Sequence, residues 1–383
     1  ASLSSDLRAD DNTTLYARGI YSQFDDQEYR RRTTFKLDEA PATANATSAL
    51  FDDADGEIEI ERDIKDRFES QKIRSLVVGG ETNSDAWKIK YSASWAKSSE
   101  QEDGSVNPTK FDNKFDGDGV SILFDYTNDM IPEFRFPTGG ALARNPAGYK
   151  LDDVELTVLS DAQDEEFSTK FDISRQFAMG SGDFTVQGGF KGRFRQKSYN
   201  FDVEFYEDST GNYTLANVLG KATYRLTDIN PVASHRGATD YFFANRADFT
   251  LQSKDSIFDS ALGDYTAEED ILATYILGRW DSEKLRVIGG VRYETTNNDL
   301  TGNIVDEDGP KITPVRFKNN YDNWLPSATI RFEPQRNLVL RAAAYRSLVR
   351  PNLSKLAPRF ELNDDDEGVF GNPTLRPYKA WNF

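Results

Sequence analysis

Residues 87–96 alternate strictly between two kinds of side chain. The apolar set is Trp87, Ile89, Tyr91, Ala93 and Trp95, and mostly lysine and serine lie between its members. A period of two predicts a β-strand with one apolar and one polar face. At about 3.3 Å per residue this strand spans roughly 26 Å, so when tilted it matches the apolar band of an outer-membrane barrel. A half-buried strand of a large soluble sheet would alternate in the same way.

The same alternation recurs along the chain. It is present in residues 15–22, 120–127, 184–195, 285–294 and 324–332, and the second face of each segment is largely polar. A soluble sandwich would turn this polar face to bulk water, whereas a large barrel would turn it to a wet or plugged lumen. After Arg195 the apolar set shifts to Tyr199, Phe201, Val203 and Phe205, which indicates a bulge or a strand that has left the membrane.

Short and long connections alternate between these segments. The tight connections are 10–12, 81–85, 179–183, 281–284 and 333–337, and the long polar ones are about 26–69, 98–116, 137–163, 206–264, 297–319 and 350–375. Outer-membrane barrels have short periplasmic turns and long extracellular loops, whereas sandwiches show turn signals every 8–12 residues or so. The sequence therefore predicts an all-β fold, a partial antiparallel transmembrane β-barrel of about 12–13 strands.

Composition excludes several other classes of protein. Hydrophobic residues make up 38% of the chain and no apolar run approaches the length of a transmembrane helix, while a transmembrane β-protein remains compatible. The formal net charge of −18 argues against nucleic acid as a partner. The chain has no cysteine and therefore no disulfide framework or thiolate metal site.

Two groups of side chains are expected to face the lipid and the lumen. Aromatic residues of the apolar stripes are predicted to form the membrane girdle: Trp87, Tyr91, Trp95, Phe124, Tyr126, Trp324 and Phe332. Basic residues of the polar faces are predicted to face the lumen: Arg18, Lys88, Lys90, Lys191, Arg193, Arg195, Arg286, Arg292 and Arg341. These cations either solvate a wet interior and contact a plug, or line an electropositive path for an anionic ligand.

Loop aromatics form the third group, the predicted ligand-binding residues. They are Tyr199, Tyr206, Tyr213, Tyr224, Tyr241 and Phe243, which could stack on sugars or other planar ligands. Packing of the long loop against itself explains them equally well.

No catalytic constellation is visible, because the single histidine, His235, has no nucleophile at motif spacing. We expect no enzymatic activity, cofactor or metal centre.

Residues 321–383 resemble the barrel of TonB-dependent outer-membrane receptors. The resemblance rests on the ordered segments 323–327 (NWLPS), 347–352 (SLVRPN), 371–377 (GNPTLRP) and 380–383 (AWNF), and residues 15–24 resemble an early barrel hairpin of that family. It implies a barrel of about 22 strands in the bacterial outer membrane, an N-terminal plug domain, and import of a scarce small-molecule ligand with energy supplied through TonB. Outer-membrane lipid, the plug and the TonB complex are thus the expected partners.

The chain departs from this family plan at both ends. We expect the plug and the TonB box to lie outside residues 1–383, before Ala1, and Phe383 to fall within the AWN segment rather than in a terminal strand. We therefore expect residues 1–383 to be a segment of one receptor barrel. An oligosaccharide is the first expectation for the ligand, with siderophores and cobalamin open. A passive porin or smaller self-closed barrel, and a soluble extracellular β-rich binding protein, are the alternatives.

Overall fold

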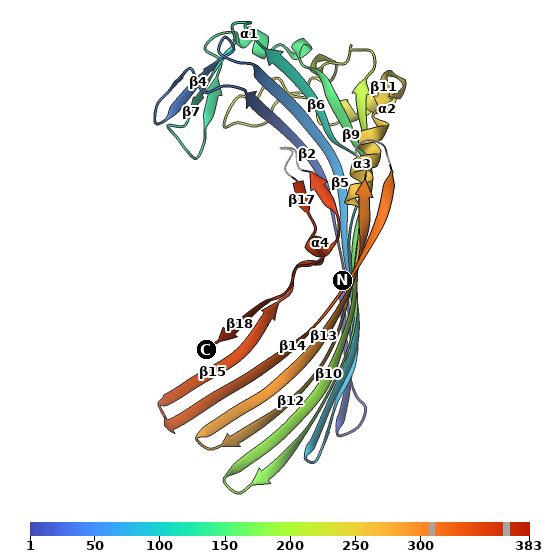
Figure 1. Cartoon of the computed structure of the whole chain (residues 1–383), viewed down its shortest axis with the longest axis vertical. Helices are drawn as coiled ribbons and strands as arrows, with labels where there is room; N and C mark the ends of the chain where they lie inside the picture. Colours follow the sequence, from blue (N-terminus) through green and yellow to red (C-terminus); the bar gives the residue numbers. More distant parts are fainter. Residues whose placement is uncertain (306–310, 363–367) are drawn as a thin grey trace.

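One large antiparallel sheet dominates the computed structural model, which describes residues 1–305, 311–362 and 368–383. The sheet bends into a tall open trough with a concave and a convex face (Figure 1). Its strands, in spatial order, are β1 (Ser2–Arg8), β2 (Thr13–Leu37), β5 (Ile58–Ser84), β6 (Trp87–Phe115), β9 (Lys150–Met179), β10 (Gly182–Asp208), β12 (Tyr265–Ser282), β13 (Leu285–Val305), β14 (Ile312–Gln335), β15 (Leu338–Val349) and β18 (Tyr378–Asn382). Strand β11 (Phe249–Leu251) pairs with β10 alone.

Smaller elements lie near one end of the trough and within it. A four-stranded sheet contains β3 (Thr43–Ala44), β4 (Ser48–Asp52), β7 (Ser121–Asp125) and β8 (Glu133–Arg135), and β16 (Phe360–Leu362) pairs with β17 (Gly368–Phe370). The helices are α1 (Gly140–Ala143), α2 (Gly237–Ala244), α3 (Ser253–Gly263) and α4 (Leu353–Leu356), with 3₁₀ turns at Pro146–Gly148, Leu215–Val218 and Arg246–Asp248. None of the helices in the described residues has the length and apolar character needed to span a membrane.

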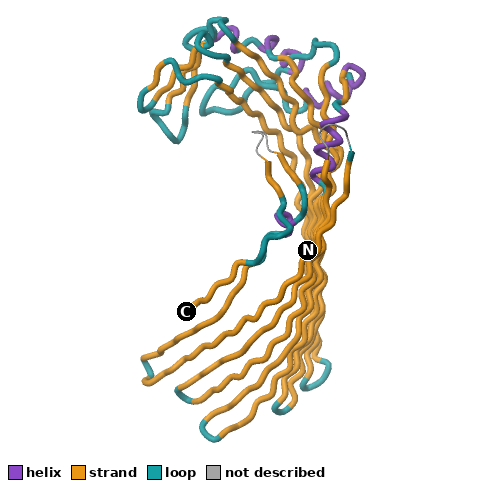
Figure 2. Tube along the Cα trace, in the orientation of Figure 1, coloured by secondary structure: helices purple, strands orange, loops and turns teal. Residues whose placement is uncertain are grey.

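The expected alternation of short and long connections is confirmed. Tight turns gather at one end of the trough, and the long excursions leave from the other end (Figure 2). The strands are longer than the pattern predicted, since β2 has 25 residues and β6 has 29. Just above the apolar belt the outer positions become polar, as at Arg74 and Lys97, while the strands stay hydrogen-bonded. Farther up, the outer face becomes apolar again at Ile64 and Ile60.

Residues 120–127 differ from their predicted role. They contain β7, which belongs to the small sheet and not to the trough. Phe124 lies edge-on against Phe35 and Phe51, with ring centroids 5.3 and 5.9 Å away, and Tyr126 follows β7. The assignment of Phe124 and Tyr126 to the membrane girdle is therefore wrong. A short strand alternates in the same way whether its apolar face meets lipid or a protein core.

The two faces of the trough differ as an outer-membrane barrel requires. Large apolar side chains of the membrane-level strands remain exposed on the convex face, among them Ile276 at 58% and Trp324 at 59%. On the concave face, α4 packs against Ala267 and Leu300, which are paired on neighbouring strands. Ala267 also pairs with Lys197 of β10, so Lys197 lies on the concave face as well. Arg195 and Arg193 lie two and four residues before Lys197 and therefore share this face. The fold predicted from sequence is thus confirmed, with apolar residues outward and charged residues inward.

The trough is an open sheet. Strands β1 and β18 form its two edges, and within the described residues no hydrogen-bonded pairing joins them. This arrangement disagrees with the alternative of a smaller barrel that closes on itself. The exposed apolar belt likewise disagrees with a soluble binding protein, because such a surface is compatible with water only when lipid or protein covers it.

Helix α3 covers the free edge of β10 above the membrane belt. Strand β12 leaves β10 at Tyr199, so the next backbone N–H groups of β10 lose their strand partner. Side chains of the helix replace that partner, since Asp264, Ser260 and Ser256 accept hydrogen bonds from the N–H groups of residues 201, 203 and 205 at 2.7, 2.9 and 3.0 Å. Their spacing of four residues matches one side of a helix, and the helix thus protects an edge that would otherwise pair with another chain.

A hydrophobic core lies outside the membrane level. The excursions 116–149 and 209–251, here called the extracellular layer, cover the convex face of the upper parts of β5, β6 and β9. Ile60, Phe111 and Phe242 are fully buried between them. Inward-pointing residues of the same strands remain charged, so this end of the sheet combines an apolar outer face with a charged inner face.

Candidate functional site

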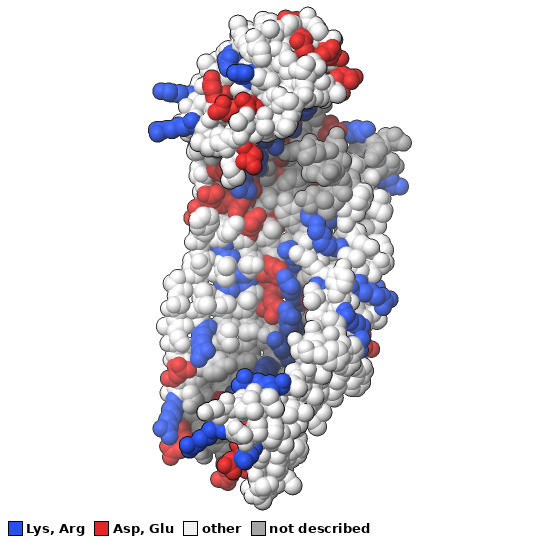
Figure 3. All heavy atoms as spheres, turned by 90° about the vertical axis from the view of Figure 1, so that its left-hand side faces the viewer, with Lys and Arg blue, Asp and Glu red and all other residues white. Residues whose placement is uncertain are grey.

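The concave face of the trough, here called the inner wall, holds the side chains that a ligand in the lumen would meet. The strand register places all of the predicted lumen cations on this face. Figure 3 looks into the hollow and shows basic and acidic side chains gathered along it. The site is therefore a long charged wall and not a single enclosed pocket.

Most of these cations are paired with carboxylates. Arg193 contacts Glu166 at 2.5 Å, and Arg195 forms two hydrogen bonds with Asp164. Further pairs on the wall are Arg292 with Glu294 at 2.6 Å, Lys90 with Glu81 at 3.1 Å, Arg18 with Asp6 at 3.8 Å, Lys88 with Glu81, and Arg286 with Asp281. In the described parts of the chain, Lys191 and Arg341 have no carboxylate within 4.0 Å. Alternating charges of this kind do not form a continuous electropositive path, so the wall favours the wet-interior interpretation.

The connection 350–377 folds back into the hollow. We call its described residues, 350–362 and 368–377, the strap. Arg350 fastens the start of the strap to the inner wall, where it donates hydrogen bonds to Glu294 at 2.6 Å and to Thr296 at 3.2 Å and lies 3.8 Å from Glu269. The side chains of Arg350 and Glu294 are 19% and 9% exposed, so this cluster is shielded from bulk water.

An apolar contact and two close approaches continue the attachment. Leu353 and Leu356 of α4 are buried against Ala267 and Leu300 of the wall. A side chain at Gly302 would collide with the carbonyl oxygen of Pro358, so the strap backbone lies directly on β13 at this point. A side chain at Gly371 would collide in the same way with the carbonyl oxygen of Ala357, where the two arms of the strap meet.

The inward-facing Tyr199 is part of this contact and not part of a loop. Its ring stacks on Phe201, and the guanidinium of Arg359 in the strap lies 5.9 Å from it and 5.0 Å from the ring of Tyr265. The strap thus explains Tyr199, whereas Phe201 lies against Gly263 of α3, where an added side chain would come within 2.9 Å of the Phe201 ring. The expected bulge exists, but it lies farther along, between Asp202 and Val203.

The other predicted ligand-binding aromatics are divided between core and surface. Tyr206 and Tyr213 are 5% and 2% exposed in the extracellular layer, and Tyr241 stacks on Tyr213 with ring centroids 4.0 Å apart. Tyr224 and Phe243 are 53% and 51% exposed. The first three rings therefore pack the loop against itself, while the last two can reach a ligand.

The two buried tyrosine hydroxyls are expected to respond differently to removal. Burial and a hydrogen bond to Glu204 raise the pKa of Tyr206 to about 12, and Arg246 also contacts its hydroxyl, whereas the hydroxyl of Tyr213 has no partner among the described residues. Tyr206→Phe should therefore destabilise the layer by about 1–3 kcal/mol and Tyr213→Phe should be neutral or stabilising. Hydrogen exchange of residues 209–251 measures both, and equal losses would contradict the assignment.

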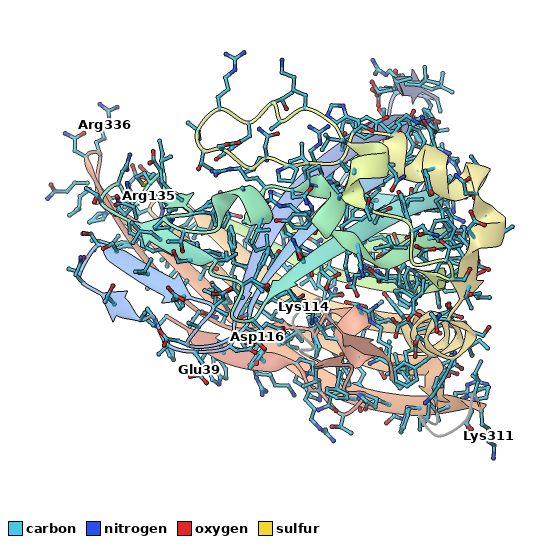
Figure 4. All side chains as sticks on the ribbon, turned by 90° about the horizontal axis from the view of Figure 1, so that it is seen from above. Glu39, Lys114, Asp116, Arg135, Lys311 and Arg336 are labelled. Atoms are coloured by element: carbon cyan, nitrogen blue, oxygen red, sulfur yellow. The ribbon has the colours of Figure 1, made fainter. Side chains whose placement is uncertain are left out.

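The extracellular part of the inner wall is a ladder of ion pairs. Lys114 lies 2.9 Å from Glu59, which also accepts a hydrogen bond from Lys36 at 2.8 Å. Figure 4 shows this end from above, with Lys114 at the end of β6 next to Asp116. Nearby, Asp153 lies 3.7 Å from Lys110 and keeps one buried oxygen without a partner.

Asp153 is expected to destabilise the folded wall at neutral pH. Burial raises the pKa of its carboxyl to about 6 from an ordinary 3.8, so the folded state binds this proton more tightly than the unfolded state does. Its unfavourable contribution is complete above pH 6 or so and disappears as the pH falls through this range. Asp153→Asn should thus stabilise β9 by at most about 3 kcal/mol at pH 8 and not near pH 4. Hydrogen exchange of residues 150–156 at the two pH values, corrected for the intrinsic pH dependence of exchange, measures this stabilisation. An equal effect of the substitution at pH 8 and pH 4 would contradict the prediction.

The remaining predicted girdle residues lie on the convex face. The residues Trp87, Tyr91, Trp324 and Phe332 are 42%, 38%, 59% and 41% exposed there, and Trp95 shares their side of the sheet.

The ring of His235 stacks on the ring of Tyr29, with ring centroids 5.0 Å apart. Within the described ranges, no three His, Cys, Asp or Glu side chains are grouped so that they could hold a metal ion.

Sequence reasoning missed the residues that attach the strap. Arg350 was part of the SLVRPN segment, but Glu269 and Glu294 lie on two other strands, far from it in the sequence. A pattern within single strands gives no signal for such a cluster. The proline and asparagine after Arg350, which end the strand and begin α4, were the available hint of an inward turn.

Residues 236–383 match the outer membrane protein beta-barrel family. A search of curated proteins gives no match. Among solved structures, the chain is similar to the ferric-catecholate import receptor Fiu of E. coli K12 in its open form, with a TM-score of 0.35, 8% identity, and coverage of 92% of this chain and 52% of that one.

Two further solved structures give similar values. For the siderophore receptor PiuA of Acinetobacter baumannii the TM-score is 0.33, the identity 11%, and the coverage 92% of this chain and 49% of that one. For the copper transporter OprC the corresponding values are 0.31, 9%, 99% and 49%. The chain thus spans about half the length of these proteins. The family match confirms the predicted outer-membrane barrel and its bacterial outer-membrane location.

Proposed function

We propose that this chain, whose residues 236–383 match the outer membrane protein beta-barrel family, is the barrel portion of a TonB-dependent receptor that imports a scarce small-molecule ligand. The observation that carries the proposal is the strap, which occupies the hollow of an outer-membrane barrel. A passive pore needs an open path, whereas an active importer needs a barrier that its energy source can displace.

The inner wall supports this proposal further. Its ion pairs give the lumen a wet, charged lining, of the kind that a folded plug with its own charged surface could contact reversibly. We propose transport without a chemical step. Plug and TonB remain the proposed partners of the full-length protein.

The ligand proposal changes from the expectation drawn from the sequence. The expectation of an oligosaccharide came from the resemblance to the family branch with long acidic, aromatic-rich loops, and three of the aromatic rings are committed to the core of the extracellular layer. We therefore propose a polar or charged ligand without preference for a sugar. The solved structures named above include a ferric-catecholate import receptor and a copper transporter, so ferric catecholates and copper belong among the ligands tested.

Growth of a deletion strain tests the function and the ligand class together. The strain is compared with its complemented parent under limiting iron, limiting copper and limiting oligosaccharide. A defect under one limitation that also requires an intact TonB system supports active import of that ligand class. A passive porin predicts a permeability loss that does not depend on TonB, and this result would overturn the proposal.

A further inference from the structure

Three cations stand out on the convex face just above the apolar belt. Lys72 and Arg74 of β5 and Lys97 of β6 point outward, because Arg74 pairs with Lys97 and the positions two residues below them are Leu76 and Trp95. We call these three residues the basic rim. Leu76 is 49% exposed on the belt, and Tyr21, paired with Arg74 on the other side, is 43% exposed.

The basic rim lies at the extracellular boundary of the membrane. The belt below it ends in the tight turns of the periplasmic side, and the strands above it lead to the extracellular layer. Aromatic rings at such a boundary mark the level of lipid headgroups. A cation one step above Trp95 or Tyr21 is therefore at headgroup height in the outer leaflet.

These cations differ from those of the inner wall in their partners. Among the described residues Lys72 and Arg74 have no carboxylate within 4.0 Å, and Lys97 reaches only Glu165 at 3.9 Å. Asp25 of β2 also interacts electrostatically with Lys72. Most inner-wall cations have close carboxylate partners. The rim cations do not, so the rim keeps a net positive charge that can attract anions.

The three cations of the rim lie on two neighbouring strands, β5 and β6. At the corresponding boundary positions of other strands the chain has acidic residues, Asp270 two positions above Leu272 on β12 and Asp322 two above Trp324 on β14. The chain carries a net charge of −18, which on average disfavours contact with anionic headgroups. A concentrated basic patch gives those headgroups one preferred position.

We propose that the basic rim is a docking surface for the phosphate groups of outer-leaflet lipids. Neighbouring side chains of paired strands lie about 5 Å apart, so Arg74 and Lys97 can contact one phosphate together, and Lys72 lies diagonally beside them. Arginine and lysine near a membrane surface each contribute roughly 1 kcal/mol to attraction of anionic lipid. The proposal needs only the outer-membrane position of the barrel and is independent of what the receptor imports.

Lipid binding by the full-length protein in detergent tests the proposal. The probe is phosphatidic acid in phosphatidylcholine mixed micelles, and retained lipid is counted by native mass spectrometry. The triple variant K72Q/R74Q/K97Q should bind phosphatidic acid about 10- to 100-fold more weakly. Each cation contributes about 1 kcal/mol to the binding free energy, and about 1.4 kcal/mol corresponds to a factor of ten in affinity. The variant K72R/K97R keeps the charges and should bind as the unmodified protein does.

A matched variant at the opposite end of the barrel provides the control. R8Q/K284Q/R336Q removes the same charge from the periplasmic turns and should leave phosphatidic acid binding unchanged. Equal weakening by this control would show a net-charge effect and overturn the proposal, as would unchanged binding by the rim variant. Displacement of the lipid by inorganic phosphate would assign the surface to free phosphate instead. A heat-modifiable band for each variant verifies that its barrel has folded.

Discussion

Replacing Arg350 with methionine is expected to release the strap from the inner wall. The guanidinium of Arg350 lies between the buried carboxylates of Glu294 and Glu269. Its loss leaves Glu269 without its ion-pair partner and Glu294 with Arg292 alone. Removing one partner of a buried ion pair costs about 3–5 kcal/mol. The remaining anchor, Leu353 and Leu356, covers a small area, so most of this cost should appear as local opening of the strap and not as unfolding of the sheet.

Hydrogen exchange of the full-length protein measures this release. Amides of residues 353–359 should exchange about 100-fold or more faster in Arg350→Met, while those of β13 change little. Arg341→Met is the matched control, because Arg341 also lies on the inner wall but has no carboxylate within 4.0 Å in the described chain. If both variants exchange alike, Arg350 does not fasten the strap. The double variant Arg350→Met with Glu269→Gln should recover part of the lost stability, since it removes the carboxylate that loses its ion-pair partner.

The trough could be predicted from sequence because its membrane strands face two different solvents. Trp87 and Tyr91 had to be apolar for lipid while Lys88 and Lys90 had to be polar for the lumen, and this contrast appears directly as alternation. The turns were predictable for a related reason, since their chemistry is local. Gly180 adopts a φ of 54° in the tight turn between β9 and β10, a conformation that glycine adopts without strain.

The extracellular half could not be predicted in the same way. There the strands have a protein layer on one face and a charged wall on the other, and the layer comes from distant parts of the chain. Tyr213 reads as an exposed loop aromatic until α2 and Tyr241 are placed against it. Phe124 reads as a girdle residue until β7 is paired with β4. Contacts between distant segments decide these assignments, and single-strand periodicity does not contain them.

Residues 1–383 produced by themselves are expected to fail as a membrane barrel. Strands β1 and β18 are the edges of the sheet, and in hydrocarbon each unpaired backbone N–H or C=O group costs several kcal/mol. An edge of even a few residues therefore costs more than the stability of a typical domain. In water the same edges pair with other chains, so aggregation is the expected outcome.

Refolding into detergent and into lipid vesicles, with the full-length protein as a positive control, measures this directly. The full-length protein should give a heat-modifiable band on gels and resist trypsin, whereas the 383-residue chain should give neither and should accumulate in inclusion bodies. The trough curves strongly, but curvature alone does not satisfy the edge groups of β1 and β18, because hydrogen bonds need strand contact at about 4.8 Å. A protease-resistant, heat-modifiable species from residues 1–383 alone would mean that the two edges meet, and the smaller self-closed barrel would then be the correct architecture.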